Sequence, residues 1–276
     1  MTAVTPSERR RARLQARDTA RIERQAVDQA KRASFKIISK AIKQFKRGES
    51  IQIRDELLKQ NEIITQFMLT SHLIGETKNK RRNLSLATPF DSVLKTLEKR
   101  SALDLTTLQI KYETESLKVL NNLSDKVEKQ LDETVGLLIS EGASTREGIK
   151  VLNETFDVLG ITPRNSFQIE SIFRTQSQLA YSAGRWQADQ DPDIQEILWG
   201  YKYVTVGDSR VRPAHVELDG MTAPKDDPIW RIFWTPNGWA CRCQILSILE
   251  PQRKRGPPKD AKPDEGFAFN PGLVFQ

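Results

Sequence analysis

The chain has 276 residues, a formal net charge of +7 and 38% hydrophobic residues, which is enough for a modest core. Its two cysteines, Cys241 and Cys243, are separated by one residue, which excludes the disulfide framework of a small secreted protein. The longest uncharged stretch, from Ile63 to Gly75, has thirteen residues, whereas a membrane-spanning helix needs about 20. The first fifteen residues lack the apolar core of a signal peptide. We therefore expect a soluble protein that is made in a reducing cytoplasm and does not contact a membrane.

The spacing of the glycines excludes three common catalytic or nucleotide-binding motifs. The 14 glycines never lie closer than six residues apart, and none is followed by Lys. The dinucleotide-binding glycine loop, the P-loop and the Gly-x-Ser-x-Gly nucleophile elbow all combine nearby glycines with specific neighbours, because backbone amides or a strained turn must approach the ligand. None of the three is expected here.

Positive charge is concentrated at the N-terminal end of the chain. Residues 1–48 hold fourteen Lys and Arg against four acidic residues, a balance of +10, whereas the remaining 228 residues hold 29 basic and 32 acidic residues. A basic end on a nearly neutral body indicates contact with a polyanion.

The first half of the chain predicts long helices. Residues 6–33 indicate a helix that is exposed or bound to a partner, because its apolar stripe is weak. That stripe consists of Leu14, Ile22 and Val27. A stronger amphipathic face follows, formed by Phe35, Ile38, Ile42 and Phe45. Gly48 predicts the end of this helix, and Ser50 predicts the N-cap of the next one, which reaches about Ile74.

The middle of the chain continues this helical pattern after a predicted loop. That loop covers residues 75–89, which are polar and basic. Residues 90–141 predict a helical region with Leu97, Leu108, Leu120, Val127, Leu131 and Leu138 at helical intervals. Ser144 and Glu147 form a capping box that opens a helix ending at Gly160. A further helix is expected from about Ser166 to Asp189, with Ile169, Phe173, Leu179 and Trp186 facing inward.

After Asp189 the pattern changes to strands and turns. Residues 199–206 have high β-propensity and an alternating pattern, which predicts a strand. Residues 240–249 predict a second strand. Between them, a short helix begins at Pro213 and ends at Gly220. The end of the chain, from Pro251, holds five of the 13 prolines and indicates a linker.

These patterns predict an α+β fold that is predominantly α. We expect an extended helical N-terminal half, followed by a small C-terminal module with a short antiparallel sheet. Four segments are expected: a basic helical arm (1–48), a helical region (49–125), the main domain (126–250) and a Pro-rich tail (251–276).

One cluster of motifs carries a family resemblance. It contains Asp208, Arg212, His215, Asp219-Gly220, the Pro-Ile-Trp segment at 228–230, Pro236-Asn237-Gly238-Trp239 and Cys241-Arg242-Cys243. The tail at 266–272 and the upstream Phe173-Arg174-Thr175 add to this set. Over roughly residues 130–272 the ordered motifs resemble the phage Mu F-like head morphogenesis family, the minor capsid proteins of tailed phages.

The resemblance implies a structural protein, not an enzyme, with no catalytic residues. A member of this family is expected inside the phage head near the portal, acting in assembly or genome delivery after synthesis in the host cytoplasm. The implied partners are the portal protein and packaged double-stranded DNA, with the major capsid or scaffold protein as further candidates. The residues expected to form the family's structural motif are Asp208, Arg212, Asp219, Gly220, Trp239 and Arg242.

The cysteines and one histidine allow a metal site. His215, Cys241 and Cys243 offer the ligands that Zn²⁺ prefers, and Asp208 or Asp219 can supply the fourth. The alternative is two small buried residues on one strand face and a histidine with ordinary hydrogen bonds. Both remain open, because Cys-x-Cys is a weaker signal than Cys-x-x-Cys and Arg212 stands where some relatives have cysteine. No other cofactor is expected.

The remaining aromatic and histidine residues suit a core. The sequence favours core positions for most of Trp199, Trp230, Trp234 and Trp239. His72 lies in an apolar helix, where a packed and hydrogen-bonded side chain is expected. Asp208 is expected to accept backbone amides or to pair with Arg210 or Arg212.

The basic N-terminus has three interpretations: contact with phosphates of packaged DNA, docking on an acidic face of the portal, or a solvated helix without a ligand. The arginines expected to contact DNA are Arg9, Arg10, Arg11, Arg13 and Arg17. Because Phe35 is the first aromatic residue, base stacking is not expected, and binding would be independent of DNA sequence. The rival function is a virion-carried zinc-dependent nuclease or cell-wall hydrolase. A nuclease would normally have more histidines around its metal than this sequence offers. A hydrolase needs two carboxylates, and the acidic residues form no distinctive pattern that would indicate them.

Overall fold

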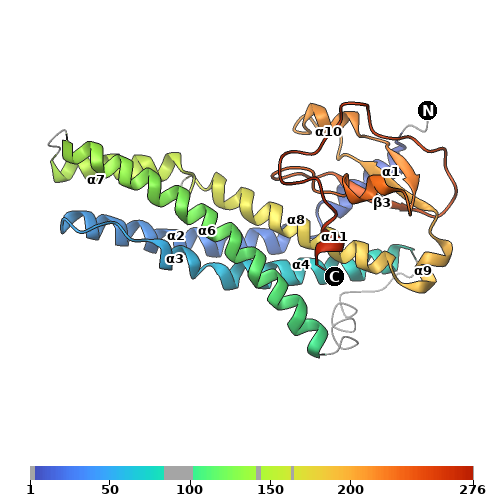
Figure 1. Ribbon diagram of the computed structural model, residues 1–276, viewed down its shortest axis with the longest axis horizontal. Helices are drawn as coiled ribbons and strands as arrows, with labels where there is room; N and C mark the ends of the chain where they lie inside the picture. The colour runs from blue at the N-terminus through green and yellow to red at the C-terminus, as the bar shows by residue number, and fades with distance from the viewer. Residues whose placement is uncertain (1–3, 84–101, 141–143, 163–164, 276) are drawn as a thin grey trace. The chain divides into compact units, whose positions relative to one another are not determined.

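The computed structural model describes residues 4–83, 102–140, 144–162 and 165–275, and these are mostly helical (Figure 1). The longer helices are α1 (Pro6–Gln15), α2 (Ala20–Lys46), α4 (Asn61–Asn83), α6 (Ala102–Ser140), α7 (Thr145–Val158) and α8 (Phe167–Asp189). The shorter ones are α3 (Arg54–Leu58), α9 (Pro192–Ile197), α10 (Pro213–Glu217), the 3-10 helix η1 (Pro228–Arg231) and α11 (Pro271–Val274). The strands are β1 (Gly200–Val204), β2 (Thr222–Pro224) and β3 (Gln244–Ile248). The predicted class, α+β and mainly α with a small antiparallel sheet, is confirmed.

The chain folds into two compact units that are not consecutive in sequence. One, here called the helical unit, consists of Arg24–Phe67 and Gln109–Phe173. The other, the sheet unit, consists of Met1–Glu23, Met68–Leu108 and Arg174–Gln276. Helices α2, α4, α6 and α8 each contribute residues to both units.

The helical unit has an apolar core, to which most of the predicted periodic positions outside α2 contribute. Its fully buried side chains include Ile37, Ile64, Phe67, Leu120, Val127, Leu131 and Phe156. The rings of Phe67 and Phe173 lie 5.8 Å apart. Ser144 and Glu147 form the predicted capping box at the start of α7, and Gly160, with a positive φ of 68°, follows its end. A left-handed residue at this position is a common way to terminate a helix.

The sheet unit holds a three-stranded antiparallel sheet in the order β2-β1-β3. Tyr201 of β1 is opposite Ala223 of β2 and Ser247 of β3. Because successive side chains of a strand point to opposite faces, β1 serves two cores. Tyr201 and Tyr203 pack with Trp230 and Trp234 on one face. Val204 packs on the other face in a cluster with Ala12 of α1, Leu246 and Ile248.

Helix α1 is therefore a structural part of the sheet unit. Lys202 of β1 is only 2% exposed, and its Nζ lies 2.8 Å from Oε1 of Glu8. Arg13 donates from Nε to the carbonyl oxygen of Val206 at 2.8 Å. The expectation of a helix that is exposed or bound to a partner is wrong for α1, since Ala12 and Gln15 are buried. The chain also leaves the helix at residues 16–19, so residues 6–33 do not form one continuous helix.

Several expected boundaries also differ from the structure. Ser50 caps no helix, because α3 begins at Arg54 after Ile53. Residues 75–83 belong to α4 and not to a loop, whereas 84–89 and the first part of the predicted helical region, residues 90–101, lie outside the described residues. Polar side chains there do not break the helix because several are buried within the sheet unit: Asn79 is fully buried, and its amide donates to Oδ1 of Asp189 at 2.8 Å.

The C-terminal segment is not a linker. Arg255 forms a β-bridge with Thr222, Phe267 is buried, and the side-chain amide of Asn270 donates to the carbonyl oxygen of Trp230 at 3.2 Å. The prolines allow this segment to cover the sheet unit without regular hydrogen bonding. Strand β2 and helix α9 were not expected from the sequence; β2 is only three residues long.

Candidate functional site

The region from Val206 to Cys243 brings the motif residues together in the sheet unit. The chain leaves β1 through Gly207, passes α10, and reaches Gly220, whose φ is 80°. There the amide of Gly220 donates to the carbonyl oxygen of Tyr203 at 2.8 Å. Glycine suits this position because it adopts a positive φ at no steric cost. The turn returns the chain to β2 and places Asp219 beside β1.

Asp219 organises the base of this turn. Its carboxylate accepts two hydrogen bonds from Arg9, at 2.7 and 2.6 Å, and one from the amide of Thr205 at 2.8 Å. Burial raises the pKa of Asp219, but the hydrogen bond from Arg9, helped by Thr205, outweighs burial and lowers the pKa below its ordinary value. The carboxylate thus stays charged and holds α1 against the turn.

Asp208 forms the second ion pair of the region. Its two oxygens accept from Nη1 and Nη2 of Arg242 at 2.6 and 2.8 Å, and its Oδ1 also accepts from the amide of Arg210. The hydrogen bond from Arg242 lowers the pKa of Asp208 to about 2. The expected contact with a backbone amide of the turn is confirmed, and so is the pairing with the Arg210 side chain, at 3.8 Å. The alternative pairing with Arg212 is wrong, because Arg212 donates to the carbonyl oxygen of Trp239 at 2.6 Å.

His215, Cys241 and Cys243 meet in one buried cluster. Their possible ligand atoms all lie within 4.8 Å of one another. Nδ1 of His215 is 3.6 Å from each sulfur. The hydrogen bond between the thiols, together with His215, lowers the pKa of Cys241, whereas the same bond and burial raise the pKa of Cys243. A cavity of about 20 Å³ adjoins the three residues, which is room for about one water molecule or ion.

Neither predicted fourth ligand joins this cluster. Among the described residues, the group with metal-ligand geometry contains His215, Cys241 and Cys243 alone. Asp208 is bound to Arg242 and Asp219 to Arg9. The arrangement can therefore hold an ion through three protein ligands, with the small cavity for a fourth.

The upstream Arg-Thr motif supports the cysteine turn. Thr175 of α8 is 1% exposed, and its hydroxyl accepts from the amide of Ala240 at 2.8 Å. Ala240 has a φ of 53°, a backbone conformation that is uncommon for residues other than glycine. Thr175 thus fixes the strained residue that precedes Cys241. Arg174 pairs instead with Glu23, at 2.9 Å.

The remaining sequence expectations have mixed outcomes. Trp230 and Trp234 are buried as expected, whereas Trp239 is 45% exposed and packs on the ring of Phe267 at 5.7 Å. His72 is buried, with Nε2 3.0 Å from Oε1 of Gln187, which confirms the hydrogen-bonded interpretation. Of the arginines expected to contact DNA, Arg9 is bound within the unit.

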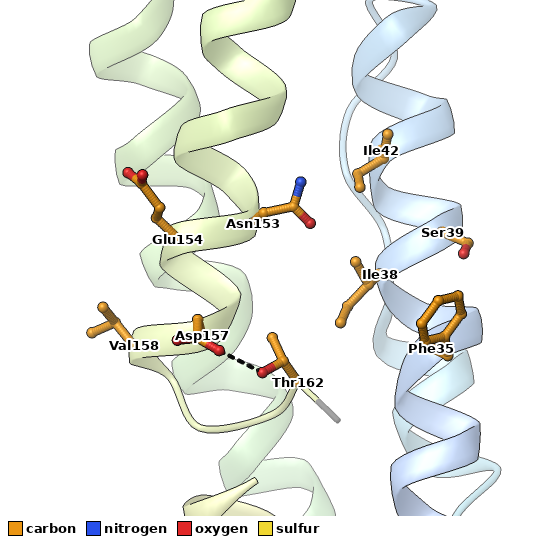
Figure 2. A pocket seen from close by; sticks show the side chains of 9 residues that line it. All are labelled: Phe35, Ile38, Ser39, Ile42, Asn153, Glu154, Asp157, Val158 and Thr162. Atoms are coloured by element: carbon orange, nitrogen blue, oxygen red, sulfur yellow. Dashed lines mark hydrogen bonds between the residues drawn. The ribbon is translucent and has the colours of Figure 1, made fainter. Parts of the chain in front are cut away.

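An apolar groove in the helical unit was not expected. Figure 2 shows Ile38 and Ile42 of α2 pointing toward α7 across this groove, which has a volume of about 700 Å³. Val158 on the α7 side is 76% exposed and Phe35 is 65% exposed. The predicted inward face of α2 is therefore wrong for Phe35: Ile37 and Ala41 enter the core instead. The lining residues are Phe35, Ile38, Ser39, Ile42, Asn153, Glu154, Asp157, Val158 and Thr162.

The ordered motifs of the sheet unit lie within a known family. The profile of the "Phage Mu protein F like protein" family matches residues 81–246, which include the ion pair of Asp208, the turn at Asp219 and the His-Cys cluster. The chain belongs to this Mu F-like family. The match begins and ends earlier than the region of roughly 130–272 that carries the resemblance in the sequence, so α1 and the C-terminal segment lie outside it.

Two curated relatives agree with this assignment. The chain is 34% identical over 124 residues to the "Mu-like prophage FluMu F protein" of Haemophilus influenzae, covering 41% of this chain and 30% of the relative. It is 28% identical over 152 residues to the "Putative capsid assembly protein F" of Escherichia phage Mu, covering 49% of this chain and 32% of the relative. The alignments thus span about a third of each relative. No solved structure matches the chain significantly.

Proposed function

We propose that this Mu F-like protein is a structural component of a tailed-phage head that acts in capsid assembly. The family match over residues 81–246 supports this proposal, together with the name of the phage Mu relative, which refers to capsid assembly. We place the protein inside the head near the portal, with the portal protein and packaged DNA as partners. In the described part of the chain, no helix has the length and apolar character of a membrane span.

Burial of the His-Cys cluster is the observation that favours architecture over catalysis. His215 and Cys243 are each 2% exposed and Cys241 is 3% exposed. A catalytic zinc needs an open position for its substrate, whereas the adjoining cavity of about 20 Å³ holds no more than a water molecule. The cluster is therefore proposed as a structural site, in which Zn²⁺ would join the chain near Cys241 to α10. A zinc nuclease or hydrolase is not supported by this geometry.

The apolar groove supports a protein partner in the head. Exposed apolar patches on soluble proteins are typical of protein interfaces, and Phe35 and Val158 are the most exposed large side chains of the groove. We assign the portal protein to this surface as the partner. Contact there would attach the protein through the helical unit.

The position of the protein in purified particles tests this proposal. Mass spectrometry and antibody labelling should detect it in intact heads at low copy number, protected from added protease until the heads are opened. Phe35→Asp should reduce incorporation at least about tenfold. The matched control is Ile110→Asp, because Ile110 is 57% exposed but does not line the groove. The proposal would be contradicted if the protein were absent from particles. It would also be contradicted if the protein degraded DNA or cell wall and His215→Ala abolished this activity without unfolding the protein.

A further inference from the structure

The sheet unit has a second pocket, which is lined mainly by arginines. Its volume is about 490 Å³, within the range of roughly 300–1,000 Å³ of sites that hold organic ligands. Four arginines line it from three separate parts of the chain. The full lining, here called the arginine pocket, is Arg13, Ala16, Arg17, Val206, Asp208, Arg210 and Arg242.

The pocket carries an excess of positive charge. Four guanidinium groups face one carboxylate, that of Asp208. Both oxygens of Asp208 are bound by Arg242, so this pair is internally neutralised. Arg210 is 3.8 Å from Asp208 and its side chain is 79% exposed, so its charge is only loosely compensated. The pocket thus has a net charge of +3, which is four positive groups minus one.

Two of the arginines, Arg13 of α1 and Arg17 in the turn that follows it, have donors left for a ligand. Arg13 uses Nε to donate to the carbonyl oxygen of Val206 at 2.8 Å, which orients its guanidinium group and leaves the two terminal nitrogens for other acceptors. Within the described residues, Arg17 forms no ion pair with a carboxylate. Guanidinium groups with free terminal nitrogens match the oxygens of a phosphate in pairs.

The rest of the lining selects the kind of ligand. Ala16 and Val206 are its only apolar members, and none of the lining residues is aromatic. A site for a free nucleotide or a single strand would be expected to offer a surface on which a base stacks. A duplex presents its phosphates on the outside, and these require charge and hydrogen-bond donors only.

We propose that the arginine pocket binds the phosphodiester backbone of duplex DNA. The choice of DNA rests on the proposed function, because packaged DNA is the polyanion available inside a head. The pocket differs from the basic arm expected from the sequence. Arg9 is bound to Asp219 and does not take part, while Arg210, far from the N-terminus, does. Binding therefore requires the folded sheet unit and not residues 1–48 alone.

Fluorescence anisotropy of a labelled duplex, titrated with the full-length protein at several salt concentrations, tests this site. The double variant Arg17→Ala/Arg210→Ala removes two charges from the pocket. The matched control is Arg253→Ala/Lys259→Ala, since both residues are exposed in the same unit and lie outside the pocket. Thermal melting of each variant shows whether it is folded.

The pocket variant should bind at least about tenfold more weakly than wild type, and the slope of log affinity against log salt should decrease by about 1.8, or 0.9 per lost phosphate contact. The control should change affinity less than about threefold. The proposal would be overturned if both double variants lost affinity equally or if the wild type did not bind the duplex. Tighter binding of a single strand of equal length would also overturn it. Such a result would leave the role in head assembly standing, because that role is tested in particles.

Discussion

Arg9 and Asp219, 210 positions apart in the sequence, form a bidentate ion pair in which Nη1 and Nη2 donate to the two carboxylate oxygens at 2.7 and 2.6 Å. Arg9 lies outside the region that matches the Mu F-like family, whereas Asp219 lies within it. A second ion pair, between Glu8 and the buried Lys202, joins the same two parts. The N-terminal helix is therefore fixed to the family's motif by two partly buried ion pairs.

Replacing Arg9 with Ala should destabilise the sheet unit by about 1–3 kcal/mol, the usual range for a lost hydrogen bond to a charged group. The loss should stay moderate because both side chains retain some exposure, 23% and 18%. Denaturant unfolding measures the change. Arg10→Ala is the control, since Arg10 is exposed on the same helix, and it should alter stability by less than about 0.5 kcal/mol. An equal effect of both variants would show that the pair contributes nothing specific.

Two glycines allow helices α4 and α8 to pack closely in the sheet unit. A Cβ atom at Gly184 would overlap the carbonyl oxygen of His72, and one at Gly75 would overlap that of Tyr181. Ser71 and Ser177 form a hydrogen bond of 3.2 Å at the same contact. Gly184→Ala should therefore destabilise the protein by about 2 kcal/mol or more, because backbone must shift in a packed core.

The control for this prediction is Gly136→Ala in α6. A Cβ atom there would meet nothing within 4 Å, and alanine is a better helix former than glycine by about 0.5–1 kcal/mol. We thus expect opposite signs from two chemically identical substitutions, measured as shifts in melting temperature. A stabilising effect of Gly184→Ala would contradict the close contact of α4 and α8.

The sequence predicted local structure well where a single segment determines it. The capping box at Ser144 depends on residues three positions apart, and the strand around Tyr201 has an alternating pattern; both are confirmed. The convergence of His215 with the cysteines, which the sequence allowed as one of two alternatives, is also found. In each case the residues that decide the structure lie close together in sequence or within one motif.

The wrong predictions depend on distant parts of the chain. Polar residues such as Asn79 indicated a loop, but they are buried in α4 against Asp189, about a hundred residues away. Phe35 has helical spacing with Ile38 and Ile42, yet the core selects the neighbouring stripe of Ile37 and Ala41. The arginine pocket has no pattern in the sequence, because its members meet only when α1 packs on the sheet unit.

A buried carboxylate makes stability depend on pH. Asp189 is fully buried, and desolvation raises its pKa to about 6, although Arg185, Ser247, Asn79 and Arg11 oppose the shift. Because the folded state binds this proton more tightly than the unfolded state, the contribution of Asp189 is most favourable below about pH 4 and declines as the pH rises through 6. The shift from 3.8 to about 6 corresponds to about 3 kcal/mol.

Asp189→Asn should remove this dependence while keeping most of the hydrogen bonds to Asn79 and Ser247. The free energy of unfolding of wild type relative to the variant should fall between pH 4 and pH 7, by no more than about 3 kcal/mol. The difference between the two proteins isolates Asp189 from other groups, such as Asp208, whose lowered pKa makes stability fall at acid pH. A constant difference across this range would show that Asp189 is charged throughout.

The His-Cys cluster makes a prediction about metal content. Protein purified without chelators should contain about one Zn²⁺ per chain, and Cys241→Ser or His215→Ala should lose it, because each removes one of only three protein ligands brought together in the described residues. Metal analysis measures the content directly. Chelation should lower the melting temperature of wild type, since metal bound only to the folded state stabilises it. The same treatment of Cys241→Ser serves as the control and should cause no further change. Metal-free wild type with an unchanged melting temperature would instead establish the cluster as two buried thiols hydrogen-bonded to His215.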